Sequence, residues 1–372
     1  MTNTDLYIGL MSGTSMDGID AVLVGFPDQR CAIHAHHPRD YPADLRALLG
    51  RVTRDPAGGT LPELAGLDVR IAEEFAAAAR HVLADVAIDR QSIRAIGSHG
   101  QTVFHAPDGP ARTTVQLGDP ALIAARTGLT VVGDFRRGDV ALGGQGAPLV
   151  PAFHRYAFTV PTEARAVVNI GGIANVTLLN PGAPLIAYDT GPGNTLLDAW
   201  CTEHTGCAFD TGGRFAASGR VNEALLAKLL ADDYFGRLPP KSTGVDYFNP
   251  AWIHCRIGSG SKIRIAPEDM QATLAELTAA TIASALAGAA GLAVCGGGAY
   301  NDDLLGRLRR QLPGCVVHTT TDWGIPPELV EAAAFAWFAR ERLAARPTNA
   351  PEVTGATARL SMGGVYLPPA GP

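Results

Sequence analysis

The side chains best suited to chemistry gather near the N-terminus of this chain. Gly13, Thr14 and Ser15 lie in a run of small and hydroxyl residues between two short apolar segments, residues 6–8 and 21–24. Apolar segments broken by Gly, Ser, Thr and Asp predict a β-hairpin. Glycines at its tip remove the Cβ atoms that would block an anion, so N–H groups and hydroxyls could surround a phosphate. An ordinary glycine-rich turn is the alternative.

A second segment of the same design covers residues 167–179. Gly171, Gly172 and Asn175 stand there between two apolar runs. The repetition indicates a second hairpin that could bind phosphate, about one domain further along the chain. Two such hairpins predict a duplicated architecture that holds one nucleotide from both sides.

A third segment, residues 292–301, has the composition of a buried strand that ends in three glycines. Gly297 and Gly298 belong to this run. Backbone without side chains could lie flat against a planar group such as adenine. The order of the three segments along the chain is more specific than any one of them.

Asp189 is the residue that we expect to carry catalysis. It follows the strand-like residues 186–188 and precedes Gly191-Pro192-Gly193-Asn194, which opens a predicted helix. Ligands of open α/β sheets bind where strands end. A carboxylate at that place could take the proton of an attacking hydroxyl during phosphoryl transfer. A helix cap or turn is the alternative role for Asp189.

Several motifs, taken together, resemble one known family. The sequence Met11-Ser12-Gly13-Thr14-Ser15-Met16-Asp17-Gly18 resembles the signature of the anhydro-N-acetylmuramic acid kinases, within the superfamily of sugar kinases, actin and heat-shock ATPases. Further segments that match the family are Ser98-His99-Gly100-Gln101-Thr102, Gly133-Asp134-Phe135-Arg136, residues 143–151, residues 188–194 and residues 239–244. The matches run from about residue 7 to residue 338, which is nearly the whole chain.

The resemblance implies an α/β protein with a two-domain, actin-like ATPase (ribonuclease H-like) fold and an interdomain cleft. It implies an ATP- and Mg²⁺-dependent kinase of 1,6-anhydro-N-acetylmuramic acid, an amino sugar of peptidoglycan recycling. Water would open the 1,6-anhydro ring with help from Asp189, and the freed O6 would take the γ-phosphoryl group, giving N-acetylmuramic acid 6-phosphate. Another sugar kinase or ATPase of the superfamily is the alternative.

The same resemblance assigns the residues that bind ATP. They are Gly13, Thr14, Ser15, Met16, Asp17, Gly18, Ile19 and Asp20 of the first hairpin, Gly171, Gly172 and Asn175 of the second, and Gly297 and Gly298. Phosphates repel a carboxylate unless a cation intervenes, so Asp17 is also expected to face Mg²⁺ through water. The alternative is that Asp17 caps its own turn.

The acceptor sugar would be recognised by neutral polar groups and a cation. The expected residues are His99, Gln101, Thr102, Asp134, Arg136, Gly193, Asn194 and Glu331. Arg136 is the best candidate for the lactyl carboxylate of the sugar, because guanidinium matches a carboxylate bidentately. His99 could instead be structural, and Glu331 could be an exposed residue at a helix start.

Composition and length limit the possible partners and the number of domains. The chain has 372 residues, 47% of them hydrophobic, and a net charge of −6, which disfavours a nucleic-acid partner. We expect an N-terminal domain over residues 1–137, a C-terminal domain over 138–344, and a tail from about 345 to 372 that packs on the first domain. The Gly/Pro-rich stretch 138–151 is the expected hinge.

Location and partners follow from what the sequence lacks. No signal peptide is evident, the six cysteines form no CxxC pair, and a cytoplasmic enzyme with free thiols is expected. Residues 277–301 carry no charge but contain Thr, Ser and Gly, so a buried helix followed by a core strand is favoured over a membrane span. A homodimer is left open.

Other enzyme classes lack their motifs in this sequence. There is no GxxxxGK[ST], no GxGxxG after an early strand, no GxSxG and no HExxH. A carbamoyl-transferring metalloprotein would need clustered histidines for iron, whereas His34, His36 and His37 lie in a segment that resembles a surface loop. An ATP-gated chaperone would need a long substrate-binding domain, for which the chain has no room.

Overall fold

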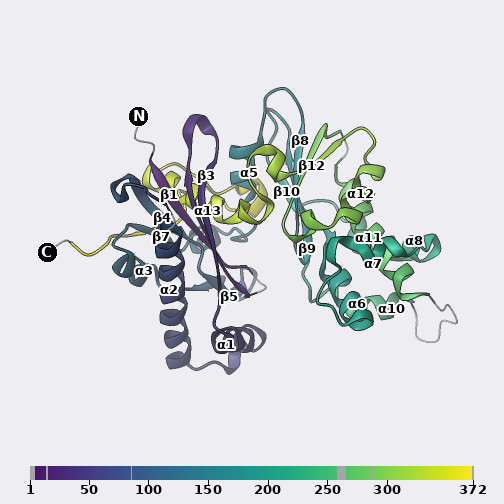
Figure 1. Ribbon diagram of the computed structural model, residues 1–372, viewed down its shortest axis with the longest axis horizontal. Coiled ribbons are helices and arrows are strands. Elements are labelled where there is room, and N and C mark those ends of the chain that lie inside the picture. The colour runs from purple at the N-terminus through teal and green to yellow at the C-terminus, as the bar shows by residue number, and fades with distance from the viewer. Residues whose placement is uncertain (1–4, 14–15, 85, 258–264, 287, 371–372) are drawn as a thin grey trace. The chain divides into compact units, whose positions relative to one another are not determined.

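The chain folds into two compact α/β units. The computed structural model describes residues 5–370 except 14–15, 85, 258–264 and 287, and Figure 1 traces the chain from end to end. Unit 1 is formed by the chain up to Ala157 and again from Leu329 onward. Unit 2 is formed by Phe158–Glu328. Thr14 and Ser15, two of the expected phosphate contacts, lie outside the described residues.

Unit 1 is built on a mixed sheet with the order β13-β7-β4-β1-β2-β3. Its strands are β1 (Leu6–Met11), β2 (Gly18–Gly25), β3 (Ala32–Asp40), β4 (Ile93–Ser98), β7 (Val131–Gly133) and β13 (Gly364–Tyr366). The predicted first hairpin is present, because β1 pairs antiparallel with β2 from Leu6 to Met11. The strands β4 and β7 extend the sheet in parallel on the other side of β1.

Unit 2 repeats this arrangement with the order β10-β9-β8-β11-β12. Its strands are β8 (Arg165–Ile170), β9 (Ile173–Leu179), β10 (Ile186–Pro192), β11 (Gly291–Cys295) and β12 (Val316–Thr319). The first three strands are antiparallel neighbours, and β11 and β12 run parallel to β8. Counted from β3 in unit 1 and from β10 in unit 2, both sheets have the order third, second, first, fourth, fifth, and β13 adds a sixth strand to unit 1. The predicted duplication and the actin-like, ribonuclease H-like fold class are therefore confirmed.

Helices and one small sheet complete each unit. Unit 1 adds α1 (Ala43–Arg54), α2 (Leu61–Ala84), β5 (Gln101–Ala106), β6 (Thr113–Leu117), α3 (Pro120–Thr127), α4 (Arg137–Ala141), α13 (Val330–Leu343) and α14 (Pro351–Thr354), and α5 (Pro151–Phe158) ends at the boundary. Unit 2 adds α6 (Thr195–Thr205), α7 (Arg214–Ser218), α8 (Glu223–Leu230), α9 (Asp233–Gly236), α10 (Pro250–Ile257), α11 (Pro267–Ser284) and α12 (Asp302–Gln311). Asp119 caps α3 through Ala121 N–H, as its sequence predicts.

Helix α13 packs closely on β1 and β4 because both strands carry a glycine at the contact. A Cβ atom added to Gly9 would stand 2.8 Å from the carbonyl carbon of Ala332. One added to Gly97 would stand 2.6 Å from that of Phe335 and 3.2 Å from Cβ of Ala339. Carbon atoms pack best at about 3.5–4.0 Å, so neither strand position has room for a side chain.

The division into units differs from the expected one, which placed residues 138–157 and α13 in the second domain. Asp139 is fully buried and accepts hydrogen bonds from Gly146 N (2.8 Å), Thr354 Oγ1 (2.9 Å) and Asn349 Nδ2 (3.2 Å). These bonds tie the predicted hinge to the C-terminal segment of unit 1. The strand β13 pairs with β7, so the end of the chain also belongs to this unit.

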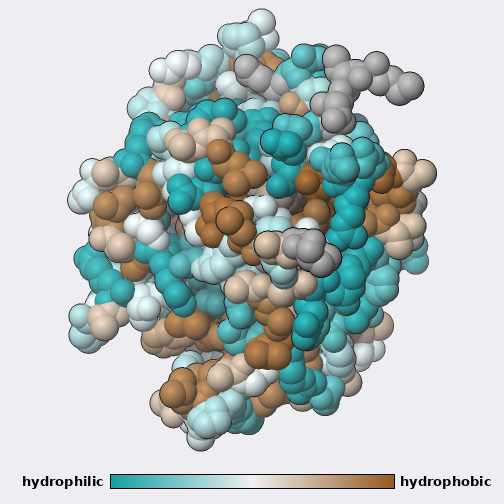
Figure 2. All heavy atoms as spheres, turned by 90° about the vertical axis from the view of Figure 1, so that its left-hand side faces the viewer, coloured by the Kyte–Doolittle hydropathy of each residue, from teal (hydrophilic) through white to brown (hydrophobic). Residues whose placement is uncertain are grey.

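No helix among the described residues is long and apolar enough to cross a membrane. The uncharged stretch after residue 277 forms the end of α11 and then β11, as predicted. On the face shown in Figure 2, hydrophilic and apolar side chains are interspersed. All six cysteines are free thiols.

Candidate active site

The turn between β1 and β2 is fastened to the rest of unit 1 by Ser12 and Gln101. The hydroxyl of Ser12 lies 2.7 Å from both Gly18 O and Gln101 Oε1, and Gln101 Nε2 donates to Gly13 O at 3.1 Å. Both side chains are almost fully buried. Gln101 therefore holds the turn, a role that the sequence did not reveal, and Ser12 was not among the expected residues although it stands in the signature.

The other described residues in and next to this turn differ in exposure. Met16 adopts a left-handed conformation (φ 55°), and its N–H donates to Gly13 O at 3.3 Å. Ile19 is 2% exposed and belongs to the core of unit 1, so only its backbone could face a ligand. Gly18 has no room for a side chain, since a Cβ atom would meet Arg39 O at 2.5 Å.

Two carboxylates follow the turn. Asp17 is exposed, and its carbonyl accepts from Tyr41 N–H at 3.0 Å. Asp20 is half-buried and lies 3.2 Å from Nε2 of His36. Within the part of the chain that the structure describes, no group of three or more His, Cys, Asp or Glu residues could hold a metal ion by itself.

His99 and Arg136 form the centre of a buried polar cluster in unit 1. Arg136 donates to Nε2 of His99 through Nε (3.1 Å) and Nη2 (2.9 Å), and to Gly146 O through Nη1 (2.7 Å). Because Nε2 accepts, the proton of the neutral imidazole must sit on Nδ1. Burial and the charge of Arg136 both hold the pKa of His99 well below its usual value. Burial lowers the pKa of Arg136 to about 10, which leaves it charged at neutral pH.

Glu331 joins this cluster from the first turn of α13. Burial raises the pKa of Glu331, the charge of Arg136 lowers it, and the charge of Asp20 raises it. Asp20, Arg136 and Glu331 are therefore electrostatic neighbours. Glu331 is not the exposed helix-start residue that the sequence left open, and the structure brings it close to Arg136.

A polar cavity of about 170 Å³ lies beside His99 at the ends of β4 and β7. Asp134 lines it in a left-handed conformation (φ 58°), with Arg137 Nε 3.7 Å from its carboxylate. Ser98 and Gln116 also line it, and Ser98 Oγ and Gln116 Oε1 have no hydrogen-bond partner among the described residues. Such atoms would gain from a polar ligand or water.

Thr102, another expected contact, lies in β5, where its hydroxyl accepts from Gln116 Nε2 at 3.2 Å. Ser98, Gln116 and Arg137 were not among the expected residues. Ser98 stands in a motif that was singled out, whereas nothing in the sequence marks Gln116.

In unit 2, Asp189 lies inside β10, where it pairs with Asn175 of β9 just before an irregularity in the ladder. Its carboxylate Oδ2 accepts from Thr243 N–H at 3.0 Å. The helix cap that the sequence left open is excluded, since α6 begins after Asn194. Burial raises the pKa of Asp189 to about 6, against the hydrogen bond from Thr243, which lowers it. A carboxylate with this pKa is ionised at pH 7 and is a stronger base than an ordinary Asp.

The second hairpin turn is joined directly to the start of α6. Gly193 N donates to Gly172 O (2.9 Å) and Asn194 N to Gly171 O (2.7 Å). A Cβ atom on Gly193 would stand 3.1 Å from both Ala174 N and Ile173 C, so only glycine fits this approach. Asn194 Nδ2 also donates to Ile170 O at 3.1 Å. The structure therefore places the expected phosphate contacts of unit 2 next to Gly193 and Asn194.

The glycines after β11 have different environments. Gly297 is exposed at the start of a short 3-10 helix, where it remains a candidate contact for a planar ligand. Gly298 is buried, and a Cβ atom on it would stand 2.5 Å from Cβ of Ile170. Packing against Ile170 therefore explains why residue 298 is a glycine. The contact of Gly298 with adenine stays a prediction.

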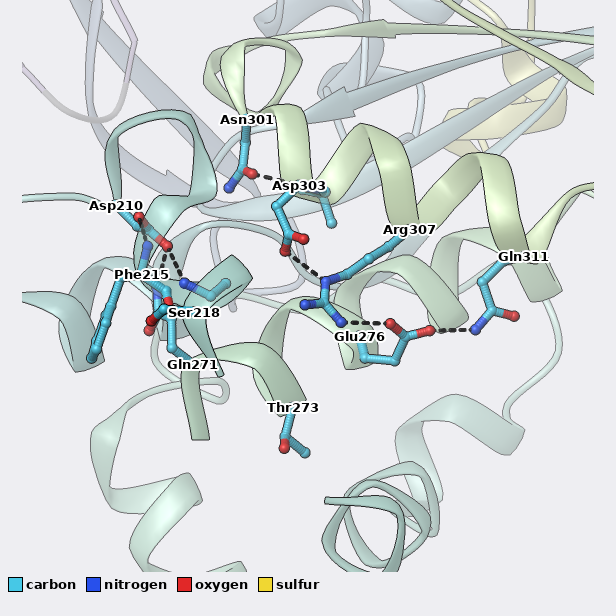
Figure 3. Close-up of polar contacts among 12 residues, drawn as sticks. Asp210, Phe215, Ser218, Gln271, Thr273, Glu276, Asn301, Asp303, Arg307 and Gln311 are labelled. Atoms are coloured by element: carbon cyan, nitrogen blue, oxygen red, sulfur yellow. Dashed lines mark hydrogen bonds and ion pairs between the residues drawn. The ribbon is translucent and has the colours of Figure 1, made fainter. Parts of the chain in front are cut away.

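A charged network holds the helix that follows these glycines. Asn301 caps α12 by accepting from Leu304 N at 3.0 Å. Arg307 of α12 donates to Asp303 (2.7 Å) and to Glu276 of α11 (2.8 Å), as Figure 3 shows. Arg307 is nearly fully buried, so its charge is neutralised by both carboxylates. The network fixes α12, and with it the end of the glycine loop.

Comparisons with known proteins agree with one another. The sequence profile of the family described as "Anhydro-N-acetylmuramic acid kinase" matches residues 5–368. A protein of this name from Xanthomonas campestris pv. campestris (strain 8004) is 47% identical over 372 residues, covering 98% of each chain. Another, from Vibrio vulnificus (strain CMCP6), is 47% identical over 371 residues, covering 98% of this chain and 99% of that protein.

Solved structures are more distantly similar. A ROK family glucokinase from Streptomyces griseus, in complex with glucose and AMPPNP, is 16% identical and covers 90% of this chain and 99% of that chain, with a TM-score of 0.41.

Proposed function

Since this chain belongs to the anhydro-N-acetylmuramic acid kinase family, we propose that it is an ATP-dependent kinase of 1,6-anhydro-N-acetylmuramic acid. The enzyme opens the 1,6-anhydro ring with water and transfers the γ-phosphoryl group of ATP to O6. The product is N-acetylmuramic acid 6-phosphate, an intermediate of peptidoglycan recycling. The alternative is another sugar kinase of the same superfamily.

The observation that carries the proposed mechanism is the environment of Asp189. Its carboxylate is half-buried at a strand irregularity, has a pKa of about 6, and accepts one hydrogen bond from Thr243 N–H. In the proposed reaction Asp189 takes a proton from water as the water oxygen bonds to C1 of the sugar. The bond between C1 and the bridging oxygen breaks, and that oxygen, now O6, attacks the γ-phosphorus while ADP leaves.

The cluster in unit 1 is proposed to bind the sugar. His99, Gln101, Thr102 and Asp134 supply neutral and acidic polar groups, while Gly193 and Asn194 supply backbone and amide groups in unit 2. The contacts of Arg136 to His99 and Gly146 use three of the five N–H groups of a guanidinium. The other two could meet the lactyl carboxylate, with Glu331 beside them to hold the orientation of Arg136.

The glycine-rich turns are proposed to bind ATP. In unit 1 the contacts come from the backbone of Gly13 to Asp20, and in unit 2 from Gly171, Gly172, Asn175 and Gly297. Mg²⁺ commonly keeps several waters and needs only one or two carboxylates besides the phosphates. An exposed Asp17 fits that requirement through a bridging water, and the ion would neutralise phosphate charge.

One experiment tests the proposed function directly. The protein is incubated with ATP, Mg²⁺ and a panel of sugars: 1,6-anhydro-N-acetylmuramic acid, the anhydro sugar without the lactyl group, and ordinary amino sugars. We expect ADP release and a 6-phosphate with the anhydromuramic sugar above all others. In water enriched in ¹⁸O, the label should enter at the anomeric carbon. Phosphorylation of an ordinary hexose alone, or a product without ¹⁸O, would refute the ring-opening reaction.

A further inference from the structure

Asp189 is held by three hydrogen bonds from one neighbouring stretch of chain, in addition to the pairing of β10 with β9. Its N–H donates to Lys241 O at 3.3 Å, and its carbonyl accepts from the hydroxyl of Tyr234 at 2.7 Å. Its carboxylate Oδ2 accepts from Thr243 N–H at 3.0 Å. Both main-chain groups and the side chain of Asp189 are thus bound by residues between 234 and 243.

These partners are themselves firmly placed. Tyr234 is 2% exposed and packs edge-on against Phe248, with ring centroids 5.6 Å apart. Lys241 Nζ lies 4.8 Å from the ring centroid of Tyr234 and 5.7 Å from that of Tyr188. It also donates to Tyr234 O (3.3 Å) and Phe235 O (3.4 Å). The ammonium group of Lys241 therefore binds the 241–243 segment to α9. This attachment holds Thr243 N–H within hydrogen-bond distance of the Asp189 carboxylate.

We propose that Tyr234 and the 241–243 segment are positioning residues for Asp189, which fix the main chain of the base and direct its free carboxylate oxygen toward the attacking water. The inference rests on the proposed function, in which Asp189 is the base. The hydrogen bond from Thr243 N–H to Oδ2 fixes the orientation of the carboxylate, and thereby decides where Oδ1 points. A displacement of a catalytic group by about 1 Å can cost roughly 100-fold in rate, which gives such a restraint a measurable effect.

The same restraint sets the basicity of Asp189. Burial raises the pKa of its carboxyl, and the N–H of Thr243 lowers it. The titratable groups of the neighbouring segments are Tyr188, Tyr234, Arg237 and Lys241. Burial keeps both tyrosines protonated by raising their pKa, and burial and the charge of Arg237 lower that of Lys241. None of these groups is a principal cause of the pKa of Asp189, so removal of Thr243 N–H should appear in the pH profile.

The first test compares Thr243→Pro with Thr243→Ala, in phosphorylation of 1,6-anhydro-N-acetylmuramic acid by ATP. Proline removes the backbone N–H that donates to Oδ2, whereas alanine keeps it and removes only the side chain. We expect the acidic limb of the kcat–pH profile to lie about one pH unit or more higher for Thr243→Pro than for Thr243→Ala, the scale of one hydrogen bond to a charged group. Coincident acidic limbs would overturn the proposal.

The second test removes a hydroxyl and does not depend on how well the proline variant folds. Tyr234→Phe deletes the donor to Asp189 O and keeps the ring. Tyr247→Phe is the matched control, because Tyr247 belongs to the same aromatic cluster but donates to Asp232 Oδ1 (2.9 Å). We expect kcat to fall about 10-fold for Tyr234→Phe with KM for ATP unchanged. Equal kcat values for the two variants would contradict a positioning role.

The failure of this inference differs from the failure of the proposed function. If Asp189→Asn retains wild-type kcat, the base is wrongly assigned and the proposed mechanism fails. If Asp189→Asn is inactive while Tyr234→Phe and Thr243→Pro behave as their controls, the base stands and the positioning role is refuted. Circular dichroism of each variant shows whether a loss of activity accompanies a loss of structure.

Discussion

Replacement of Gly97 by alanine should test how closely α13 approaches the sheet of unit 1. The added Cβ atom would stand 2.6 Å from the carbonyl carbon of Phe335 and 3.2 Å from Cβ of Ala339. Ordinary carbon contacts are about 3.5–4.0 Å. Because the obstacle is helix backbone, no side-chain rotation can relieve the overlap. The helix must therefore move away from β4 by about 1 Å.

Two effects of different size follow from that displacement. Overpacking of a buried contact costs about 1–3 kcal/mol of unfolding free energy, and backbone against backbone should lie at the upper end. For a unit of this size, each kcal/mol lowers Tm by about 2–4 °C, so a loss of roughly 6–12 °C is expected. Glu331 moves with α13, and a displacement of about 1 Å could lower kcat/KM for the sugar by roughly 100-fold.

Thermal unfolding followed by circular dichroism, with kinetics on the same preparations, measures both effects. Gly66→Ala is the matched control in the same unit. Gly66 lies on the exposed side of α2, and a Cβ atom there meets nothing within 4 Å. Alanine should raise stability at that position by up to about 1 kcal/mol, because glycine weakens a helix interior. If Gly97→Ala unfolds at the wild-type temperature, the close packing of α13 on β4 is refuted.

Three further predictions concern the site and its pH dependence. Asp189→Asn should lower kcat by about 100-fold or more while ATP binding, measured by calorimetry, persists. In the wild type, kcat should fall as pH drops through about 6, where Asp189 takes up a proton. A kcat that is independent of pH from 5 to 8 would contradict this assignment. Burial lowers the pKa of His154 to about 3, from about 6.5 in the unfolded chain, so its contribution to stability is complete above pH 6.5 and declines toward pH 3. In denaturant titrations at pH 7 and pH 5, His154→Leu should therefore lose less stability than the wild type, and equal losses would exclude His154 as the cause. Arg136→Ala should reduce kcat/KM for the anhydromuramic sugar about 10- to 150-fold more than for the anhydro sugar without the lactyl group, whereas equal losses would show that Arg136 acts only through His99 and Gly146.

Local patterns along the chain predicted much of the architecture. The two hairpins, the buried strand β11 and the capped start of α3 follow from residues that are close in sequence, where turn chemistry and apolar periodicity act directly. Helix α2 is continuous through Gly66, because its other residues bury a long apolar face. The motif set also identified the family.

Tertiary structure alone decided which segments share a unit. The sequence predicted that α13 lies with the second domain, because it follows those elements in the chain, whereas its contact surface is formed by Gly9 and Gly97 near the other end. Asp139 shows the same effect, since its partners Asn349 and Thr354 lie more than 200 residues away. Pairings at such separations leave no local signal.

For the candidate site, too, some residues were predicted from the sequence and some contacts are visible only in the structure. Residue type and position were sufficient to single out Asp189, because a carboxylate directly after a strand is chemically conspicuous, whereas the roles expected for His99, Arg136 and Glu331 depended on the family resemblance. Sequence could not show that Arg136 donates to His99 or that Gly298 makes room for Ile170. It also could not show that Tyr234 and Thr243 hold Asp189, because hydrogen bonds to a backbone carbonyl or from a backbone N–H place no demand on residue type that a single sequence reveals. Those contacts, and the pKa values that follow from burial, exist only once the chain has folded.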